Sequence, residues 1–592
     1  MKTRAPAPYN DRDALFTAKV DAWQPLPRGF FGAYGRGGFD ILNGRERGFD
    51  AERRRIVFLA FENRYAPLGG LAAVMRHLPA YLRRSGEEVL IFTPFYPNIA
   101  RFKEAMAGGE LELILPPQEF QSSSYKGVVS CYVNNDGPAA AYFVSIDGRF
   151  TASLNPYSYL DASDILDDSL AFCAAVPFVL KKLGVDRDIL FHAHDWEAAP
   201  IALTSKIAVF SGVLENARTV LTLHNSFDSG IDAERKRLFF GDVPGDTVLQ
   251  CALPLLNGPL TTVSAPFAGE LCADPLQRTI FTNHLQAGFS ENPPIGIENG
   301  MFGKPYLRYT HTALSHARQG ACGKILAEKA RFRVETLAFV KAASRREGAI
   351  GSLKDAAADT GRPIFFMSGR LDLMQKGFDV IFHAIQSFPV GEAGLIFCPS
   401  SADGARSSKE LAFFREIAES RLGDIVIWPF RISTEEYVSA VLGSSFLLMP
   451  SFYEPFGAAT EGLMHGTPVV ARATGGLTVQ VRPPAGEESV GAATGLLYRE
   501  SIGGGDAEAG GGWRDILNVP VEERINVPLY ESMANEAFGA LKRAAEIFAD
   551  GPAYGRMMVN GMDSLRAFSW GAAVEKYRRV YDAASRRGFF DE

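Results

Sequence analysis

The 592-residue chain lacks the features that mark several common protein classes. Its six cysteines show no paired spacing, which argues against a disulfide framework and against a zinc site. No continuous apolar stretch of signal-peptide length lies at its start. The longest apolar run, residues 170–180, contains a proline and is shorter than the ~20 residues of a membrane-spanning helix. The net charge of −7 favours neither nucleic acid nor a membrane as a partner. We therefore expect a soluble, cytoplasmic protein.

The signatures of several enzyme classes are also missing. The sequence contains no P-loop, no GxSxG nucleophile elbow and no GxGxxG fingerprint. His192 and His194 lie two residues apart, but no acidic or cysteine partner stands at a matching metal-ligand spacing. A histidine at a strand end that hydrogen-bonds a hydroxyl is therefore expected there instead of a metal ligand.

Most of the chain alternates short apolar runs with helical segments. The first series of runs comprises residues 56–61, 89–97, 139–146, 189–196, 219–225 and 260–264. The second series comprises residues 363–371, 393–400, 424–430, 445–451, 468–474 and 495–498. Strands that are buried on both faces and separated by helices are typical of doubly wound, mostly parallel sheets. The pattern predicts an α/β protein with two Rossmann-like domains.

A chain of this length is too long for a single core. We expect an arm over residues 1–50, a first Rossmann-like domain over 51–310, a second over 311–570, and a C-terminal helix over 571–592. The arm is rich in glycine, arginine and proline and has no regular period, which favours an extended segment. The run GGGDAEAGGGW at residues 503–513 predicts a mobile loop.

The centre of the candidate site is the stretch FLLMPSFYEPFGAATEGLMHGTPVVARATGGL, residues 446–477. Its first four residues predict a buried strand that ends at a proline, and Glu454 follows in a loop. A helix carrying Glu461, a second strand at 469–471 and a tight turn complete the stretch, and that turn contains Thr474, Gly475 and Gly476. Two carboxylates so placed first suggest paired acid and base groups.

Ligands of open parallel sheets bind beyond the carboxyl ends of the strands. The residues that fall at the ends of other expected strands are Gly69, Gly70, His194, Asn225, Asn299, Arg370 and Lys376. Each has an ordinary explanation, since a glycine pair before a helix is mostly turn chemistry and loop cations are usually solvated. Together they describe a cleft between two domains, in which the two cations beside a helix start suit a diphosphate.

Nine segments then resemble the glycogen and starch synthases in that family's order. They are APLGGLAAV (66–74), FHAHDWEAAP (191–200), LTLHN (221–225), TTVSAPFAGEL (261–271), GIENGM (296–301), SGRLDLMQKGFD (368–379), MPSFYEPFGAATEGLMHGTPVV (449–470), TGGL (474–477) and FSWGAAVEKYRRVY (568–581). The resemblance covers roughly residues 55–585 and implies a retaining glycosyltransferase of the GT-B fold. In that fold two Rossmann-like domains face each other across a cleft, and the last helix returns to the first domain.

The resemblance also implies roles for the candidate residues. The reaction would transfer glucose from ADP-glucose or UDP-glucose to the end of an α-1,4-glucan. Arg370 and Lys376 would neutralise the diphosphate leaving group, so that no metal and no other cofactor is needed. Glu454 would orient the donor sugar and support the oxocarbenium charge, and Glu461 would bind the nucleotide ribose. The donor would also meet backbone groups and side chains of Gly69, Gly70, His194, Asn225, Asn299, Thr474, Gly475 and Gly476.

Several departures from the family leave alternatives open. Pro67 stands where synthases that use ADP-glucose have a lysine, and Glu197 stands where they have a histidine. Arg370 and Lys376 are one residue further apart than in those enzymes, a spacing more similar to the UDP-glucose-dependent animal and fungal enzymes. Glu454 and Glu461 have six residues between them, where the wider class commonly has seven. A transferase with a different acceptor and a non-catalytic paralogue that binds glucan or nucleotide sugar are therefore alternatives. Glycogen phosphorylase shares the fold, but no matching lysine context for its pyridoxal phosphate is found.

Overall fold

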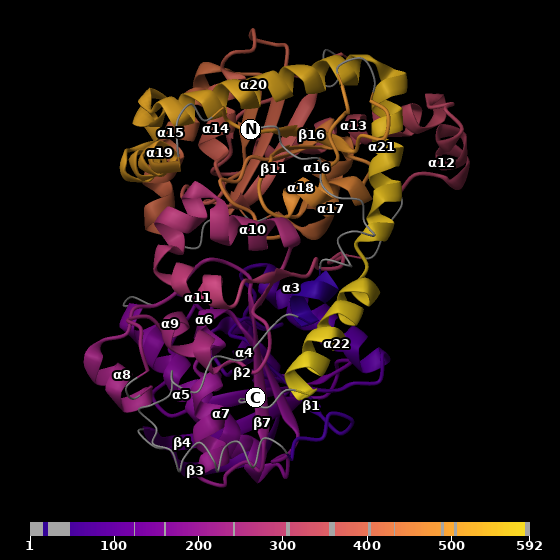
Figure 1. Ribbon diagram of the computed structural model, residues 1–592. Helices are drawn as coiled ribbons and strands as arrows, with labels where there is room; N and C mark the ends of the chain where they lie inside the picture. The colour runs from indigo at the N-terminus through magenta and orange to yellow at the C-terminus, as the bar shows by residue number, and fades with distance from the viewer. Residues whose placement is uncertain are drawn as a thin grey trace. The chain divides into compact units, whose positions relative to one another are not determined.

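The computed structural model divides the chain into two compact units, which we describe separately (Figure 1). Unit 1 comprises residues 1–302 and 570–592, and unit 2 comprises residues 303–569. The structure describes residues 16–21, 48–122, 125–158, 162–240, 243–303, 308–354, 361–400, 404–430, 432–486, 490–501 and 506–586. Within these residues no helix is both long and apolar enough to cross a membrane.

Unit 1 contains a mixed sheet with the strand order β3-β4-β5-β2-β1-β6-β7-β8-β9. Its strands are β1 (Arg55–Leu59), β2 (Glu88–Pro94), β3 (Glu112–Ser122), β4 (Tyr125–Asn134), β5 (Ala140–Ile146), β6 (Ile189–His194), β7 (Ala217–Leu223), β8 (Thr261–Thr262) and β9 (Ile295–Gly296). The central strand β1 pairs in parallel with β2 and β6, while β3, β4 and β5 pair in antiparallel fashion. The buried runs at β1, β6 and β7 are continuous because helices cover both faces of a parallel sheet.

Unit 1 contains a series of α-helices in the described part of the chain, in addition to a helical segment at residues 16–21. They are α3 (Gly70–Arg84), α4 (Ala100–Ala107), α5 (Ala162–Lys182), α6 (Asp195–Ala198), α7 (Ile201–Phe210), α8 (Ala233–Phe239), α9 (Val248–Ala252), α10 (Ala265–Ala273), α11 (Gln286–Glu291) and α22 (Trp570–Arg586). The last of these comes from the far end of the sequence and lies against α3 and β7 (Figure 1).

The packing of α22 explains why the end of the chain belongs to unit 1. Val574, Tyr577 and Tyr581 are buried in a core that also contains residues of β1 and α3. At the start of the helix the indole Nε1 of Trp570 donates a hydrogen bond of 2.8 Å to the carbonyl oxygen of Met301. The expected return of the last helix to the first domain is therefore confirmed.

Part of the expected N-terminal arm also packs on unit 1. Residues 16–21 are helical, and Phe16 and Val20 are buried in the same core as α22. Lys576 of α22 places its ammonium 5.5 Å from the centre of the Phe16 ring. The rest of the expected arm, up to residue 47, lies outside the described residues.

Unit 2 contains a second sheet with the order β10-β13-β12-β11-β14-β15-β16. Its strands are β10 (Ile350–Gly351), β11 (Ile364–Arg370), β12 (Gly394–Ser400), β13 (Ile425–Ile427), β14 (Phe446–Met449), β15 (Val469–Arg472) and β16 (Gly495–Tyr498). All of these pairs are parallel except β10 with β13. The carboxyl ends of β11, β14 and β15 are therefore neighbours at one edge of the sheet.

The helices of unit 2 that the structure describes are α12 (His311–Arg318), α13 (Gly323–Ala343), α14 (Phe378–Ile385), α15 (Gly404–Ser420), α16 (Thr434–Gly443), α17 (Ala459–Met464), α18 (Leu477–Gln480), α19 (Asp506–Asn518), α20 (Pro528–Ala549) and α21 (Gly551–Ser564). In Figure 1 the long helix α20 runs across α14, which it contacts. Two doubly wound α/β units confirm the fold class that the alternating sequence pattern predicts.

The expected mobile loop at residues 503–513 is wrong for most of its length, because α19 begins at Asp506. Glycine costs a helix up to about 1 kcal/mol per residue, and packing must outweigh that cost. Trp513 supplies such packing, since its side chain is 1% exposed and its ring lies 5.2 Å from the guanidinium carbon of Arg472. Phe452 contacts the edge of the same indole.

Candidate functional site

The loops after β11, β14 and β15 bring several of the predicted residues together in unit 2. Lys376 Nζ lies 2.7 Å from Glu454 Oε2, and Ser451 Oγ donates a hydrogen bond of 2.8 Å to the same oxygen. The other carboxylate oxygen of Glu454, Oε1, makes no hydrogen bond within the described residues. The Glu454 residue is only 7% exposed. One of its oxygens is therefore fixed, while the other is available to a ligand.

Arg370 lies at the last position of β11, on the strand next to β14. Its Nη2 donates a hydrogen bond of 3.0 Å to Gln375 Oε1 and lies 3.7 Å from Asp372 Oδ2. Both partners belong to the loop that also carries Lys376. Arg370 thus lies at the start of this loop and Lys376 at its end, and Lys376 is the cation that pairs with Glu454.

The turn formed by Thr474, Gly475 and Gly476 closes over the Glu454 loop. The backbone N–H of Gly476 donates a hydrogen bond of 2.9 Å to the carbonyl oxygen of Glu454. A side chain at Gly476 would place its Cβ 2.7 Å from the Cα of Phe456, so the close approach requires glycine. Gly475 has a φ of 44°, in the left-handed region.

Two buried arginines brace these loops, and sequence reasoning missed both. Arg472 Nη1 donates a hydrogen bond of 2.5 Å to the carbonyl oxygen of Phe452, two residues before Glu454. Its other guanidinium nitrogens bind both carboxylate oxygens of Glu500. Burial alone would raise the pKa of Glu500, but the charges of Arg472 and Arg499 outweigh it and lower the pKa to about 2.

Arg524 supports the loop that carries the two cations. Its Nη1 donates hydrogen bonds of 2.9 Å to the carbonyl oxygen of Leu373 and of 2.9 Å to Asp379 Oδ2. Tyr530 donates a further hydrogen bond of 2.8 Å to that carboxylate oxygen. An arginine far along the chain from its partner loop leaves no local sequence pattern, so neither buried arginine could be found without the fold.

Glu461 lies on α17, one turn from the Glu454 loop, and does not pair with Glu454. Tyr437 of α16 donates a hydrogen bond of 2.8 Å to Glu461 Oε2. Burial raises the pKa of Glu461, and the hydrogen bond from Tyr437 opposes that rise. The first suggestion of a paired acid and base is therefore wrong for these two carboxylates, because each has its own partner on another element.

In unit 1 the glycine pair opens α3, and a carboxylate already occupies the helix start. Glu62 Oε2 accepts hydrogen bonds from the backbone N–H groups of Leu68 at 2.9 Å and Gly69 at 2.7 Å. Gly70 has no atom within 4 Å of the position that a Cβ would take. Glu62 lies just beyond the end of β1, and this position after a strand is the sequence feature that could have identified it.

This open space at Gly70 permits a separate test of the expected donor contact. Gly70→Ala is expected to keep or raise the melting temperature, because alanine favours a helix over glycine by up to about 1 kcal/mol. If donor sugar approaches this backbone, the same change is expected to raise the KM for the donor severalfold. Unaltered kinetics in a well-folded variant would remove Gly70 from the site.

The predicted His194 and Asn299 each bury a polar atom without a partner. His194 Nδ1 lies 2.8 Å from His224 Nε2, while its Nε2 has no hydrogen-bond partner among the described residues. The same holds for Asn299 Oδ1, in a residue that is 3% exposed. Burial lowers the pKa of His194 well below its usual range. A buried polar atom without a hydrogen-bond partner costs free energy.

His192 is a structural residue, as the sequence suggested. Its Nδ1 lies 2.8 Å from the hydroxyl of Tyr581 and its Nε2 lies 2.7 Å from Thr222 Oγ1. Within the described residues no group of three or more histidine, cysteine or acidic side chains could hold a metal ion.

Two buried acids follow β6. Asp195 has a φ of 61°, and its Oδ1 accepts a hydrogen bond of 2.6 Å from the backbone N–H of His224. Burial raises the pKa of Asp195 to about 8, and the charge of Glu62 adds to the rise. Burial and the charge of Asp195 likewise raise the pKa of Glu197.

The raised pKa of Asp195 predicts a pH dependence of stability. Between its usual value near 4 and about 8, the folded chain keeps a proton that the unfolded chain releases, so stability falls as pH rises through that range. From pH ~7 to ~8, above the usual pKa of histidine, we expect the melting temperature of Asp195→Asn to fall less than that of the unaltered protein. Calorimetry at both pH values checks this, and equal falls would contradict it.

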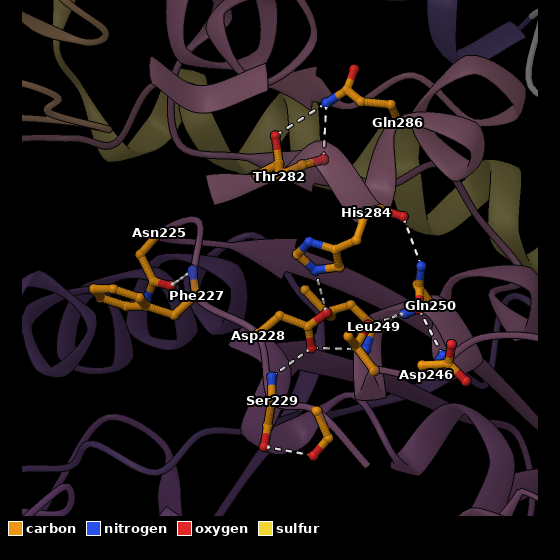
Figure 2. Close-up of polar contacts among 12 residues, drawn as sticks. Asn225, Phe227, Asp228, Ser229, Asp246, Leu249, Gln250, Thr282, His284 and Gln286 are labelled. Carbon is orange, nitrogen blue, oxygen red and sulfur yellow. Dashed lines mark hydrogen bonds and ion pairs between the residues drawn. The ribbon is translucent and has the colours of Figure 1, made fainter. Parts of the chain in front are cut away.

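Asn225 lies in the loop after β7 and makes a local turn. Its Oδ1 accepts a hydrogen bond of 2.7 Å from the backbone N–H of Phe227 (Figure 2). That hydrogen bond shapes the loop, which continues to Asp228 and Ser229.

Two family models match the chain. The model of the starch synthase catalytic domain matches residues 55–250, and that of glycosyl transferases group 1 matches residues 352–498. A glycogen synthase of Koribacter versatilis is 24% identical over 542 residues, which are 88% of this chain and 96% of the relative. A glycogen synthase of Opitutus terrae is 26% identical over 541 residues, which are 87% of this chain and 97% of the relative.

Among solved structures, a starch synthase domain has a similar fold. The catalytic domain of starch synthase IV from Arabidopsis thaliana, bound to ADP and acarbose, aligns with a TM-score of 0.67 and 19% sequence identity. The alignment covers 90% of this chain and 100% of that one.

Proposed function

Because the chain is a glycosyltransferase of the glycogen and starch synthase family, we propose that it extends an α-1,4-glucan with retention, using a nucleoside diphosphate glucose as donor. The observation that carries the proposal is the grouping of Arg370, Lys376 and Glu454 on neighbouring loops of unit 2. Two cations and one carboxylate with a free oxygen provide both charges that such a transfer needs.

The proposed mechanism assigns one task to each of these groups. Arg370 and Lys376 bind the diphosphate and stabilise the negative charge that builds as the glycosidic bond breaks, a role that other folds give to a metal ion. Glu454 Oε1 accepts hydrogen bonds from the sugar hydroxyls, and its charge stabilises the oxocarbenium character at the anomeric carbon. Glu461, oriented by Tyr437, binds the ribose.

Lys376 has two partners in this scheme. Without a donor its ammonium pairs with Glu454 at 2.7 Å. A bound diphosphate would compete for the same three N–H donors, which a lysine can share between a carboxylate and a phosphate. The ion pair therefore keeps the lysine in place before the donor arrives.

The proposal also specifies which nucleotide the donor sugar carries. Five residues separate Arg370 from Lys376, and Pro67 replaces the lysine of the ADP-glucose enzymes. Both departures favour UDP-glucose. Incubation with UDP-glucose or ADP-glucose in turn, with glycogen as primer, is expected to release UDP faster and to lengthen the glucan. The absence of nucleotide release from both donors would refute a synthase.

A second candidate is a paralogue that binds glucan or nucleotide sugar without turnover. The observation in its favour is Glu62, which occupies the N–H groups of Leu68 and Gly69 beside Pro67, a residue with neither a charge nor an N–H. Calorimetric titration separates the two candidates, because saturable binding of UDP-glucose or maltoheptaose without any transfer is expected only of the paralogue.

A further inference from the structure

A carboxylate and a histidine form a built pair in unit 1, outside the predicted site. His284 Nε2 lies 3.0 Å from Asp228 Oδ2 (Figure 2). The other oxygen of Asp228 accepts hydrogen bonds from the backbone N–H groups of Ser229 at 2.8 Å and Leu249 at 3.0 Å. The Asp228 side chain is only 3% exposed, so the carboxylate is buried and held at both oxygens.

The backbone of His284 is fixed as well. Gln250 Nε2 donates a hydrogen bond of 2.8 Å to the carbonyl oxygen of His284, and Gln250 Oε1 accepts one of 2.7 Å from the backbone N–H of Asp246. His284 is thus held at its backbone by Gln250 and at its ring by Asp228. Its side chain is nevertheless 33% exposed. A carboxylate that holds one ring nitrogen is the arrangement by which proteins set the tautomer and direction of the other.

The remaining ring nitrogen is the chemically open atom of the pair. Since Asp228 accepts a hydrogen bond from Nε2–H, the neutral ring leaves a lone pair on Nδ1. Nδ1 makes no hydrogen bond in the part of the chain that the structure describes, and Figure 2 shows it on the side of the ring away from Asp228. A ligand that fits must therefore bring a hydrogen-bond donor.

The surrounding charge narrows the class of ligand. Asp228 is close enough to Glu197 for its charge to help raise the pKa of that buried acid. An anion such as phosphate would meet the carboxylate of Asp228, whereas an uncharged hydroxyl would not be repelled. The pair also lies by the loop after β7, at the carboxyl end of the parallel strands, where open sheets bind their ligands.

We propose that Asp228 and His284 form a subsite of unit 1 in which Nδ1 of His284 accepts a hydrogen bond from a hydroxyl group of the sugar acceptor. The inference rests on the proposed glucan-extending function and names a binding residue for its acceptor. Asp228 is the positioning residue, because it acts through the ring of His284.

Two substitutions separate this role from a structural one. In His284→Gln the amide nitrogen can replace Nε2 and keep the hydrogen bond to Asp228, but no acceptor replaces Nδ1. We expect an unchanged melting temperature, an unchanged KM for the donor, and a KM for maltoheptaose raised about 3- to 10-fold, the value of one hydrogen bond. His284→Ala removes both contacts and is expected to lower the melting temperature as well.

Direct binding makes the result independent of turnover. Maltoheptaose is titrated calorimetrically into the unaltered protein and into His284→Gln in the absence of donor. Weaker binding to the variant supports the subsite even if no transfer occurs, in which case only the proposed function fails. Equal binding to both proteins, or no binding to the unaltered one, overturns the subsite. The hydrogen bond between Asp228 and His284 would then only stabilise the two loops.

Discussion

Replacing Glu454 by glutamine is expected to lower the rate of sugar transfer by about 10³-fold, because the neutral amide cannot stabilise the positive charge of the transition state. The amide can still accept a hydrogen bond from Ser451, whose hydroxyl donates to this side chain at 2.8 Å. The loop is therefore expected to keep its shape, and the KM for the donor to change only severalfold. Steady-state assay of nucleotide release with each donor measures both constants.

Ser451→Ala is the matched control for this substitution. It removes a hydrogen bond to the same oxygen but leaves the charge of Glu454 and its ion pair with Lys376 intact. We expect it to lower the rate by no more than about 10-fold, the worth of one hydrogen bond. A Glu454→Gln variant that retains more than a tenth of the rate would remove Glu454 from the reaction.

Replacing Arg472 by methionine is expected to destabilise unit 2 by about 3–5 kcal/mol, because the buried carboxylate of Glu500 loses its hydrogen bonds from Arg472 and keeps only Arg499, 3.3 Å away, as a cationic partner. The two side chains are 1% and 0% exposed, so water cannot take the place of the arginine. The change also frees the carbonyl oxygen of Phe452, and with it the loop that carries Glu454. We expect activity to fall with stability.

The double variant Arg472→Met with Glu500→Met separates these two effects. It removes the buried carboxylate together with the arginine and is expected to regain most of the lost melting temperature, since apolar residues can replace a buried ion pair at little cost. Its activity is expected to remain low, because the hydrogen bond to Phe452 is still absent. Full recovery of activity would show that Arg472 serves stability alone.

The strands of unit 2 were predictable because burial on both faces leaves continuous apolar runs. Residues 446–449 were expected as a strand and form β14. The antiparallel strands β3 and β4 were missed. In β3 only Leu115 and Phe120 are buried, and the strand contains Pro116 and Pro117, so it lacks the apolar run that marks the other strands.

The glycine-rich helix α19 was missed for a different reason. The helix propensity of this glycine-rich segment is poor. It is compensated by the packing of Trp513 against Arg472, which belongs to strand β15. Local sequence cannot reveal a gain that depends on tertiary contact. The same limit applies to Arg524, whose partners Leu373 and Asp379 are about 150 positions earlier in the chain.

The candidate site was predictable where chemistry follows a strand directly. Arg370 is the last residue of β11, and Lys376 lies in the loop that follows it. Glu454 lies in the loop after β14, which is the neighbouring strand. The Asp228–His284 pair was not predictable, because its members are 56 positions apart and belong to different loops. Whether the predicted residues bind a donor remains a proposal that the substitutions above test.

Unit 1 is discontinuous in sequence, and this has a consequence for the order in which the protein matures. The core around β1 and α3 includes Tyr577 and Tyr581, which follow all of unit 2 in the sequence. Unit 2 can therefore complete its own core before unit 1 does, because unit 1 keeps an apolar groove until α22 has been synthesised. Nascent chains that stop before Trp570 should expose that groove, and chaperones would be expected to bind the first half of the protein for longer than the second.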